Sequence, residues 1–312
     1  MPAIVRDSPI KRRKGIRTGS RAVSVIIYLI IGVIAVITLL PFVYVLSSSL
    51  SNPTAVLTNK VVLWPVGFSL ASYSQILVTP EIFRAFLNSV FFTVVITALN
   101  VLNSMLAGNA LSKPHLVFRK GIVLYILIPM YFTGGLVPTF IIVSKLGMYN
   151  TLWAIILPGI VSIWNIILAR TFITGLPPAL REAALIDGAS EIRVFRSIIL
   201  PLCKPMIAVL SLYTALYVWN SWFNFMIYIP KLANWQPLQM FLTRVLVWGN
   251  MSSMLNSSNM NPELIKQQLQ LAAVGAQLKY AVMVVAMVPI MLIYPFIQKY
   301  FMQGALLGSL KE

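Results

Sequence analysis

The residues of this sequence whose types and spacing could do chemistry lie together in one polar segment, residues 172–204, between two apolar stretches. Two small alanines in this segment let a partner's backbone or the wall of a cleft come close, so the segment indicates docking. The set consists of an acidic residue before two alanines, an acidic residue before a glycine, and a leucine before a proline: Glu182, Ala183, Ala184, Asp187, Gly188, Leu200 and Pro201.

The same segment carries signals for two short helices joined at a turn. Pro177 and Pro178 suit the start of the first helix, because the N–H group that proline lacks has no partner there. Gly188 suits the left-handed residue that closes this helix. Ser190 suits the cap of the second helix, with Glu191 at its positive end.

The second of these predicted helices is amphipathic. Ile192, Phe195 and Ile199 fall on one face, while Arg193 and Arg196 point elsewhere. The apolar face gives the helix a surface with which to pack against something else.

The sequence has few residues that could form a metal site or a catalytic site. The chain has one cysteine, Cys203, and one histidine, His115, which excludes a disulfide framework, a cysteine-built zinc site and a histidine-rich metal site. Seven acidic residues leave little for paired-carboxylate catalysis, and no G-x-x-x-x-G-K-[ST] phosphate loop occurs. We predict no catalytic residue, no metal site and no cofactor in this chain, and expect His115 to be solvated and Cys203 to be inert.

The elements that position this segment are predicted to cross a membrane. Hydrophobic residues make up 59% of the chain and charged residues 10%, against about 25% charged in a soluble domain. A spanning helix needs about 20 mostly apolar residues, and six stretches reach that length: 23–46, 85–111, 121–143, 151–171, 205–229 and 280–301. We therefore predict an all-α integral membrane protein with about six transmembrane helices.

The first span is preceded by seven basic residues and could be read as a signal peptide. Its apolar run is too long, and no small-residue cleavage site follows it, so we interpret it as an uncleaved anchor helix.

Positive charge assigns the two sides of the membrane. The segments 1–22, 112–120, 170–204 and 302–312, together with Lys299, carry 17 of the 24 Lys and Arg residues. The positive-inside rule therefore places both termini and the 172–204 loop in the cytoplasm. The net charge of +17 then reflects topology and anionic lipid headgroups. We expect no nucleic-acid partner.

Helix-breaking residues interrupt several of the predicted spans. Membrane helices tolerate them where neighbouring helices or a water-lined cavity satisfy the freed backbone groups, which favours a bundle around a pathway, although such residues are also simply frequent in membrane helices. No acidic residue lies between Glu81 and Glu182, so coupling to an ion gradient is disfavoured. The breakers are Pro129, Gly134, Gly135, Pro138, Pro158, Gly159, Pro289 and Pro295.

Four polar residues in the fifth span share one helical face, since they are spaced four, three and four residues apart. Aromatic rings and amides bind sugars, so the stripe suits a carbohydrate path; it equally suits hydrogen bonds to a partner permease. Trp219 and Trp222 point away from it and suit anchors at the outer interface. The stripe consists of Tyr213, Tyr217, Asn220 and Asn224.

The polar segment resembles the EAA loop of ABC-importer permeases, whose pattern is E-A-A, three residues, G, nine residues, I, any residue, L-P. Here Glu182-Ala183-Ala184 is followed by Gly188 at that spacing and then by Ile198 and Leu200-Pro201. The stretches 134–158 and 301–311 are similar to the carbohydrate branch, the MalG-like permeases, and more narrowly to the LplC/YtcP group, associated with oligosaccharides released from polysaccharides.

The resemblance implies a MalG-like type I importer fold and a set of partners. Glu182 would pair with a basic residue of an ATPase, and Gly188 would permit the turn of the coupling helix. ATP and Mg would bind two separate ATPase subunits, and a second homologous permease would complete the pathway. An extracytoplasmic binding protein would deliver an oligosaccharide, with the tract 250–261 as a hypothetical contact.

Two other classes of protein stay open. An ABC permease for an amino acid or polyamine would share the loop, and a ligand screen would separate it from a carbohydrate permease. A channel, secondary carrier or membrane enzyme would act without an ATPase.

Overall fold

A computed structural model describes residues 21–245 and 262–309, and in these residues every regular element is helical. A π-helical turn at Phe195–Ile199, a 3-10 turn at Ala233–Trp235 and a helix beginning at residue 238 accompany the α-helices. In chain order the α-helices are α1 (Arg21–Ser49), α2 (Pro53–Leu57), α3 (Ala71–Val78), α4 (Pro80–Ser112), α5 (Arg119–Tyr131), α6 (Leu136–Lys145), α7 (Trp153–Ile160), α8 (Ile163–Thr174), α9 (Pro178–Ile186), α10 (Glu191–Val194), α11 (Leu200–Leu202), α12 (Lys204–Trp219), α13 (Phe223–Tyr228) and α15 (Pro262–Ser309).

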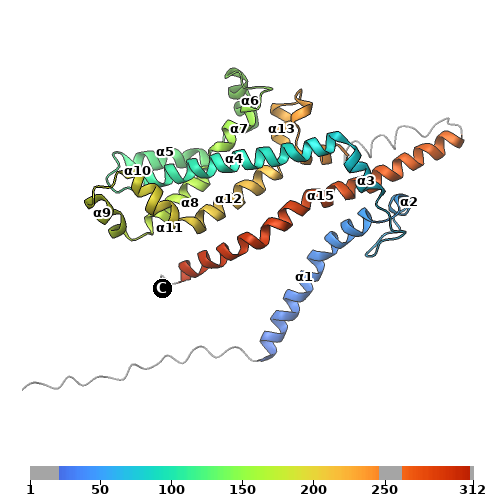
Figure 1. The fold of residues 1–312 in the computed structure, drawn as a ribbon, viewed down its shortest axis with the longest axis horizontal. Helices are drawn as coiled ribbons and strands as arrows, with labels where there is room; N and C mark the ends of the chain where they lie inside the picture. Colours follow the sequence, from blue (N-terminus) through green and yellow to red (C-terminus); the bar gives the residue numbers. More distant parts are fainter. Residues whose placement is uncertain (1–20, 246–261, 310–312) are drawn as a thin grey trace, which may run out of the picture.

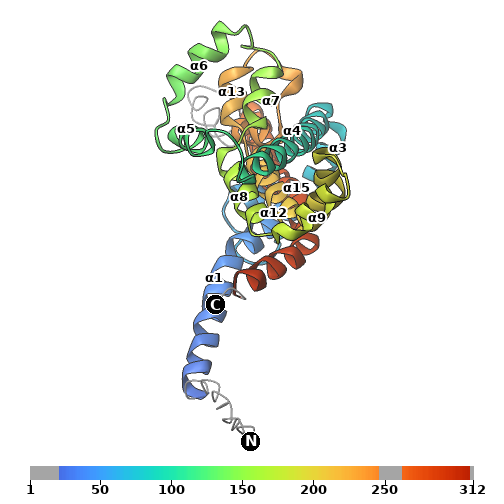
Figure 2. The same ribbon diagram turned by 90° about the vertical axis from the view of Figure 1, so that its left-hand side faces the viewer.

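The long helix α4 is the central element of the bundle (Figure 1). α8 and α12 run along it, and α7 packs against it as well. α15 packs against α12 and also contacts α1, α2 and α3, and α1 projects away from the bundle (Figure 2). The short helices α9, α10 and α11 gather at the end of α4 where Ser112 lies.

Two buried hydrophobic clusters lie along α4. Phe92 and Ile96 of α4 pack with residues of α7, α12 and α13, including Ile155 and Phe225. Nearer the other end, Val101 and Met105 pack with α8, the π-helical turn and α12. The first cluster fixes the broken helices, and the second fixes the loop that follows α8.

Small residues allow α4 and α8 to touch backbone to backbone. A Cβ placed on Gly108 would lie 2.7 Å from the Ala169 Cβ and 2.8 Å from the Arg170 backbone nitrogen. Helices in a membrane associate through such small-residue contacts, because lipid offers no hydrophobic driving force between them.

Within the described residues, four helical segments are long and apolar enough to cross a membrane, or up to six if each bent pair counts as one span. α1 and α4 cover the predicted spans 23–46 and 85–111, and α15 covers 280–301 but runs 48 residues through Pro289 and Pro295. The chain is thus an all-helical multi-pass membrane protein. Residues 1–20, the tract 250–261 and the last three residues of the predicted tail lie outside the described part.

Where the sequence predicts one span at 121–143, the structure has two helices. α5 ends at Tyr131, two residues beyond Pro129, and α6 leaves at an angle of 114° to it. Gly135 precedes α6 with φ +83°, a backbone conformation open to glycine. Proline and glycine therefore turn this stretch into a bent pair.

The predicted span 151–171 corresponds to one candidate membrane segment of 22 residues, Trp153–Thr174, whereas the predicted span 205–229 is interrupted. α7 and α8 are separated by two non-helical residues after Pro158 and Gly159. α12 ends at Trp219, and α13 starts at Phe223. At the interruption between α7 and α8, two side-chain amides of α4 satisfy the freed carbonyls: Asn100 donates to Gly159 and Asn103 donates to Ile160.

Candidate functional site

The polar loop after α8 forms the two predicted helices joined at a turn. The backbone N–H of Asp187 donates to the Ala183 carbonyl at 3.0 Å, and that of Gly188 donates to Leu185 at 3.1 Å. Gly188 has φ +77°, in the left-handed region that favours glycine. The Ser190 hydroxyl accepts from the Arg193 N–H at 3.4 Å and caps α10.

The inner face of this loop packs on the bundle and its outer face is exposed. Ala184, Ala189 and Leu200 rest against the cluster built around Phe195 and Ile199. Glu182, Ala183, Asp187, Gly188 and Pro201 are exposed, together with an apolar tip, Ile186, whose side chain is 85% exposed.

The predicted apolar face of the second helix needs one correction. Phe195 and Ile199 are buried, but Ile192 is 71% exposed, and Val194 takes a buried position instead. The reason is the π-helical turn at Phe195–Ile199, whose wider turn shifts the residues that face the bundle.

A three-residue ion cluster ties the loop to the end of α4. The Arg181 guanidinium donates to both Glu191 carboxylate oxygens at 2.7 and 2.8 Å, and the Lys113 ammonium lies 3.0 Å from the same carboxylate. Partial burial raises the pKa of Glu191, but Arg181 and Lys113 outweigh it, so this pKa lies below its ordinary value. Glu182 forms no ion pair with any described residue.

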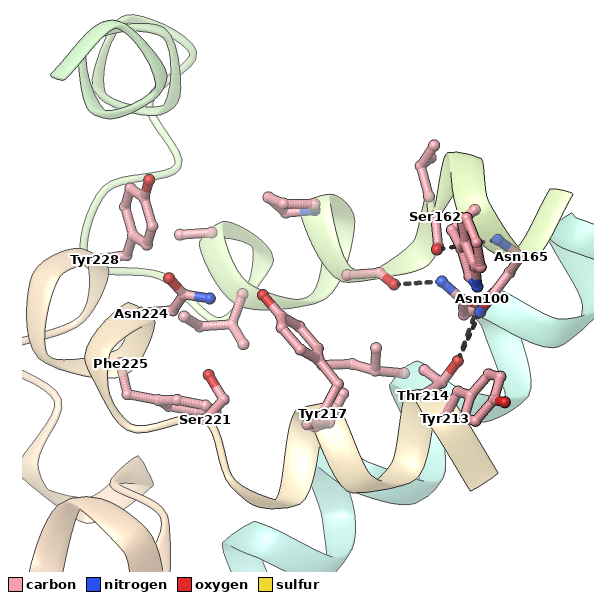
Figure 3. A pocket seen from close by; sticks show the side chains of 18 residues that line it. Asn100, Ser162, Asn165, Tyr213, Thr214, Tyr217, Ser221, Asn224, Phe225 and Tyr228 are labelled. Carbon is pink, nitrogen blue, oxygen red and sulfur yellow. Dashed lines mark hydrogen bonds between the residues drawn. The ribbon is translucent and has the colours of Figure 1, made fainter. Parts of the chain in front are cut away.

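The broken helices α7, α8, α12 and α13 enclose a cavity of about 650 Å³ against α4 (Figure 3). Its polar lining comes from tyrosines, amides and hydroxyls: Asn100, Ser162, Asn165, Tyr213, Thr214, Tyr217, Ser221, Asn224 and Tyr228. No acidic or basic side chain lines it. A neutral cavity with aromatic rings and amides can bind a hydroxylated, uncharged surface through stacking and hydrogen bonds.

One wall of the cavity is a buried hydrogen-bonded network. The Asn165 amide donates to the Asn100 side-chain oxygen at 2.8 Å and to the Thr214 hydroxyl at 2.9 Å. Asn100 in turn donates to the Gly159 carbonyl at 2.9 Å. This carbonyl lost its helical partner when α7 ended, so the network supports the break. It also fixes α4, α7, α8 and α12 relative to one another (Figure 3).

A family model described as binding-protein-dependent transport system inner membrane component matches residues 91–305. The chain belongs to this family. It is 36% identical to the polygalacturonan/rhamnogalacturonan transport system permease protein YtcP of Bacillus subtilis (strain 168), over 94% of this chain and 99% of YtcP. It is equally 36% identical to the protein LplC of the same organism, over 91% of this chain and 92% of LplC.

A solved structure shares the fold of this binding-protein-dependent permease. It is a bacterial ABC transporter involved in the import of the acidic polysaccharide alginate. Its matching chain superposes with a TM-score of 0.80 at 27% identity, covering 91% of this chain and 99% of that one. The MalG-like resemblance drawn from the sequence is confirmed at the level of family and fold.

The structure divides the stripe predicted for the fifth span of this permease. Tyr213, Tyr217 and Asn224 line the cavity, but Asn220 does not. Because α12 ends at Trp219, the Asn220 side chain is free to turn back, and it donates to the Leu216 carbonyl at 2.8 Å. Asn224 reaches the cavity from α13.

Trp219 does not lie at an outer interface, as the sequence suggested. It is buried, and its ring N–H donates to the Ala286 carbonyl at 3.0 Å while its ring contacts Phe86 edge-on. Trp222, by contrast, is partly exposed. Trp219 thus joins α12 to α4 and α15 in this permease.

The buried network is the part of the site that sequence reasoning missed. Asn100, Asn165 and Thr214 lie in three different apolar stretches, and each looks unremarkable alone. The available signal was an amide at membrane depth, which is expensive unless it has a partner. The Glu191 cluster was missed likewise, because Lys113 lies far from Glu191 in the sequence.

Proposed function

We propose that this chain is a permease subunit of an ATP-binding-cassette importer that takes up an oligosaccharide. The proposal rests on membership of the family and on YtcP, whose name describes transport of polygalacturonan and rhamnogalacturonan. The neutral cavity of tyrosines and amides supports it further, because sugars are bound by aromatic faces and amide hydrogen bonds.

The exposed outer face of α9 is the proposed contact with the ATPase. Glu182 stands there without a partner in the described residues, beside Ala183 and the exposed Ile186. A carboxylate and an apolar tip on the exposed face of a short helix fit a basic and apolar cleft on another subunit. ATP and Mg would bind on that subunit, and closure of two such subunits would drive the permease.

The remaining partners and the topology follow from the same proposal. A second homologous permease would face this chain, and an extracytoplasmic binding protein would deliver the oligosaccharide. Both termini and the 172–204 loop would lie in the cytoplasm, with the spans in the inner or plasma membrane.

The coupling role is tested by Glu182→Lys in the transporter reconstituted in proteoliposomes. We expect ATP-driven uptake of oligosaccharides from polygalacturonan or rhamnogalacturonan to fall to background, with membrane insertion unchanged. Glu81→Lys is the matched control, a charge reversal at the far end of α4, and should retain uptake. Normal uptake by Glu182→Lys would contradict the coupling role.

The substrate path is tested by Tyr217→Ala and Asn224→Ala. Losing one hydrogen bond or stacking contact of ~1 kcal/mol should weaken apparent affinity for the oligosaccharide about fivefold. Asn220→Ala is the control, because Asn220 caps its own helix outside the cavity. If Tyr217→Ala instead reduces recovery of a second permease and leaves affinity unchanged, the stripe belongs to the subunit interface.

Two experiments address the other classes. Uptake by this chain without any ATPase would identify a channel or secondary carrier. A thermal-shift screen of the cognate binding protein against sugars, amino acids and polyamines would separate the solute classes.

A further inference from the structure

A second cavity lies outside the proposed pathway, at the loop end of the bundle. It measures about 740 Å³ and lies between the start of α5, the turn before it and Arg170 of α8. α5 starts at the end of α4 where α9 and α10 gather (Figure 1). The transport proposal uses none of its residues.

Three cations line this cavity and no acid does. Arg119 and Lys120 come from the first turn of α5, and Arg170 comes from α8. The positive end of the α5 helix dipole adds to the same field. Neither ion pair of the described residues includes any of the three, since Lys113 and Arg181 take Glu191. The cavity therefore has an uncompensated positive charge.

The Arg170 side chain also has an unsatisfied hydrogen-bond donor. Its Nε atom is buried and has no hydrogen-bond partner among the described residues. A buried donor left without an acceptor is unfavourable. The same guanidinium lines the cavity, where an anionic oxygen would neutralise its charge.

The rest of the cavity is apolar and opens to the outside of the bundle. Val123, Leu124 and Leu127 of α5 form its wall. Phe118 stands at its rim with a side chain that is 84% exposed and a φ of +55°, a conformation rarely adopted by bulky residues. A small anion such as free phosphate would leave this wall uncovered, whereas an amphiphile would cover it.

We propose that this cavity binds one anionic phospholipid. The headgroup phosphate is held by Arg119, Lys120 and Arg170, and an acyl chain lies along Leu124 and Leu127. Basic pockets between membrane helices near the surface recognise lipid headgroups in this way. The site adjoins the end of α4, so the bound lipid stabilises the element to which Lys113 and Glu191 tie the coupling loop.

The test uses the full-length chain in its native assembly, with dioleoyl phosphatidylglycerol as the probe. Native mass spectrometry counts retained lipids, and titration gives the affinity. In Lys120→Gln/Arg170→Gln we expect one fewer retained phosphatidylglycerol and an affinity about fivefold weaker for each charge removed. Leu127→Trp, which fills the apolar wall without changing charge, should also lose that lipid.

The controls separate lipid from other occupants. Lys60→Gln removes a charge elsewhere and should retain the full lipid count, and dioleoyl phosphatidylcholine should bind weakly to wild type. Equal retention of phosphatidylglycerol by wild type, Lys120→Gln/Arg170→Gln and Leu127→Trp would overturn the proposal. Displacement of the lipid by millimolar inorganic phosphate would do so too, because the site would then be selective for a free anion.

Discussion

At the residue scale, Gly188 acts through its backbone conformation and Asn100 acts through its side-chain hydrogen bonds. Gly188 sets a backbone conformation: its φ is +77°, and a Cβ there would meet no atom within 4 Å. A side chain at 188 is therefore opposed by local backbone strain of about 1–2 kcal/mol and not by a clash. Asn100 sets a side-chain contact, since its amide is buried and bonded on both sides.

Gly188→Val is expected to abolish transport and leave insertion intact. A β-branched residue resists the left-handed conformation, so the turn would open and α9 would lose its orientation. Gly188→Asn should retain much of the uptake, because asparagine tolerates this region. Uptake is measured in proteoliposomes; equal activity of the two variants would show that the turn conformation is irrelevant.

Asn100→Leu should destabilise the protein by about 1–3 kcal/mol, because the buried Gly159 carbonyl loses its partner and the Asn165 amide loses one of its two acceptors. The matched variant is Asn103→Leu, which loses only the 3.4 Å contact to the Ile160 carbonyl. The midpoint of thermal unfolding in detergent should fall clearly further for Asn100→Leu. A fall of the same size in both variants would argue against the network.

At the element scale, the bundle is held by close helix contacts and by one exposed ion cluster. α4 touches α8 through Gly108, and α10 is tied to α9 and α4 through Glu191. The first contact fixes the cavity wall, and the second ties α9, the proposed coupling helix, to the bundle.

Gly108→Ala is expected to destabilise by about 1–3 kcal/mol through overpacking. The added Cβ would lie 2.8 Å from a backbone nitrogen of α8, which no rotamer change can relieve. Gly32→Ala on α1 has no atom within 4 Å and should be neutral or stabilising. Thermal unfolding of both variants checks this; a neutral Gly108→Ala would mean that α4 and α8 lie further apart.

The Glu191 cluster predicts a pH dependence. Because its folded-state pKa lies below the ordinary value of 4.5, its contribution is full above pH 4.5 and is lost as pH falls through the lowered pKa. The side chain is 47% exposed, so the contribution is about 0–1 kcal/mol. Glu191→Gln should flatten the decline in unfolding midpoint below pH 4.5, whereas Glu182→Gln should follow wild type.

At the scale of the whole molecule, α4 separates two ends of the bundle, to which the proposed function gives different tasks. The coupling loop and the proposed lipid cavity lie at the Ser112 end, while α2 and α3 lie at the Pro80 end (Figure 1). α1 has most of its side chains exposed and meets the rest of the chain near its own end, where Ser47, Ser48 and Ser49 are buried. A largely exposed apolar helix of this kind fits contact with lipid or a partner.

The topology predicts opposite labelling of the two ends. His115→Cys should react with a membrane-impermeant maleimide only after the membrane is permeabilised. Lys60→Cys should react in intact spheroplasts. The native Cys203 should remain unlabelled, because it is buried. Both positions are exposed. The reverse labelling pattern would place the coupling loop outside and contradict the proposed function.

The sequence alone determined the membrane class, the family resemblance and the local conformation of the proposed coupling loop. These depend on composition, apolar run length and local turn chemistry, which residues near one another in the chain specify. The turn at Gly188, the cap at Ser190 and the helix start at Pro178 could therefore be predicted.

Only the tertiary structure decided which polar residues meet. Asn100, Asn165 and Thr214 converge from three helices. Asn220 does not line the cavity with the rest of its stripe, because α12 ends at Trp219. Ile192, just before the π-helical turn, is exposed. Such outcomes depend on where each helix breaks and which neighbour satisfies the freed backbone groups. That is a property of the packed bundle, and no local pattern in the chain encodes it.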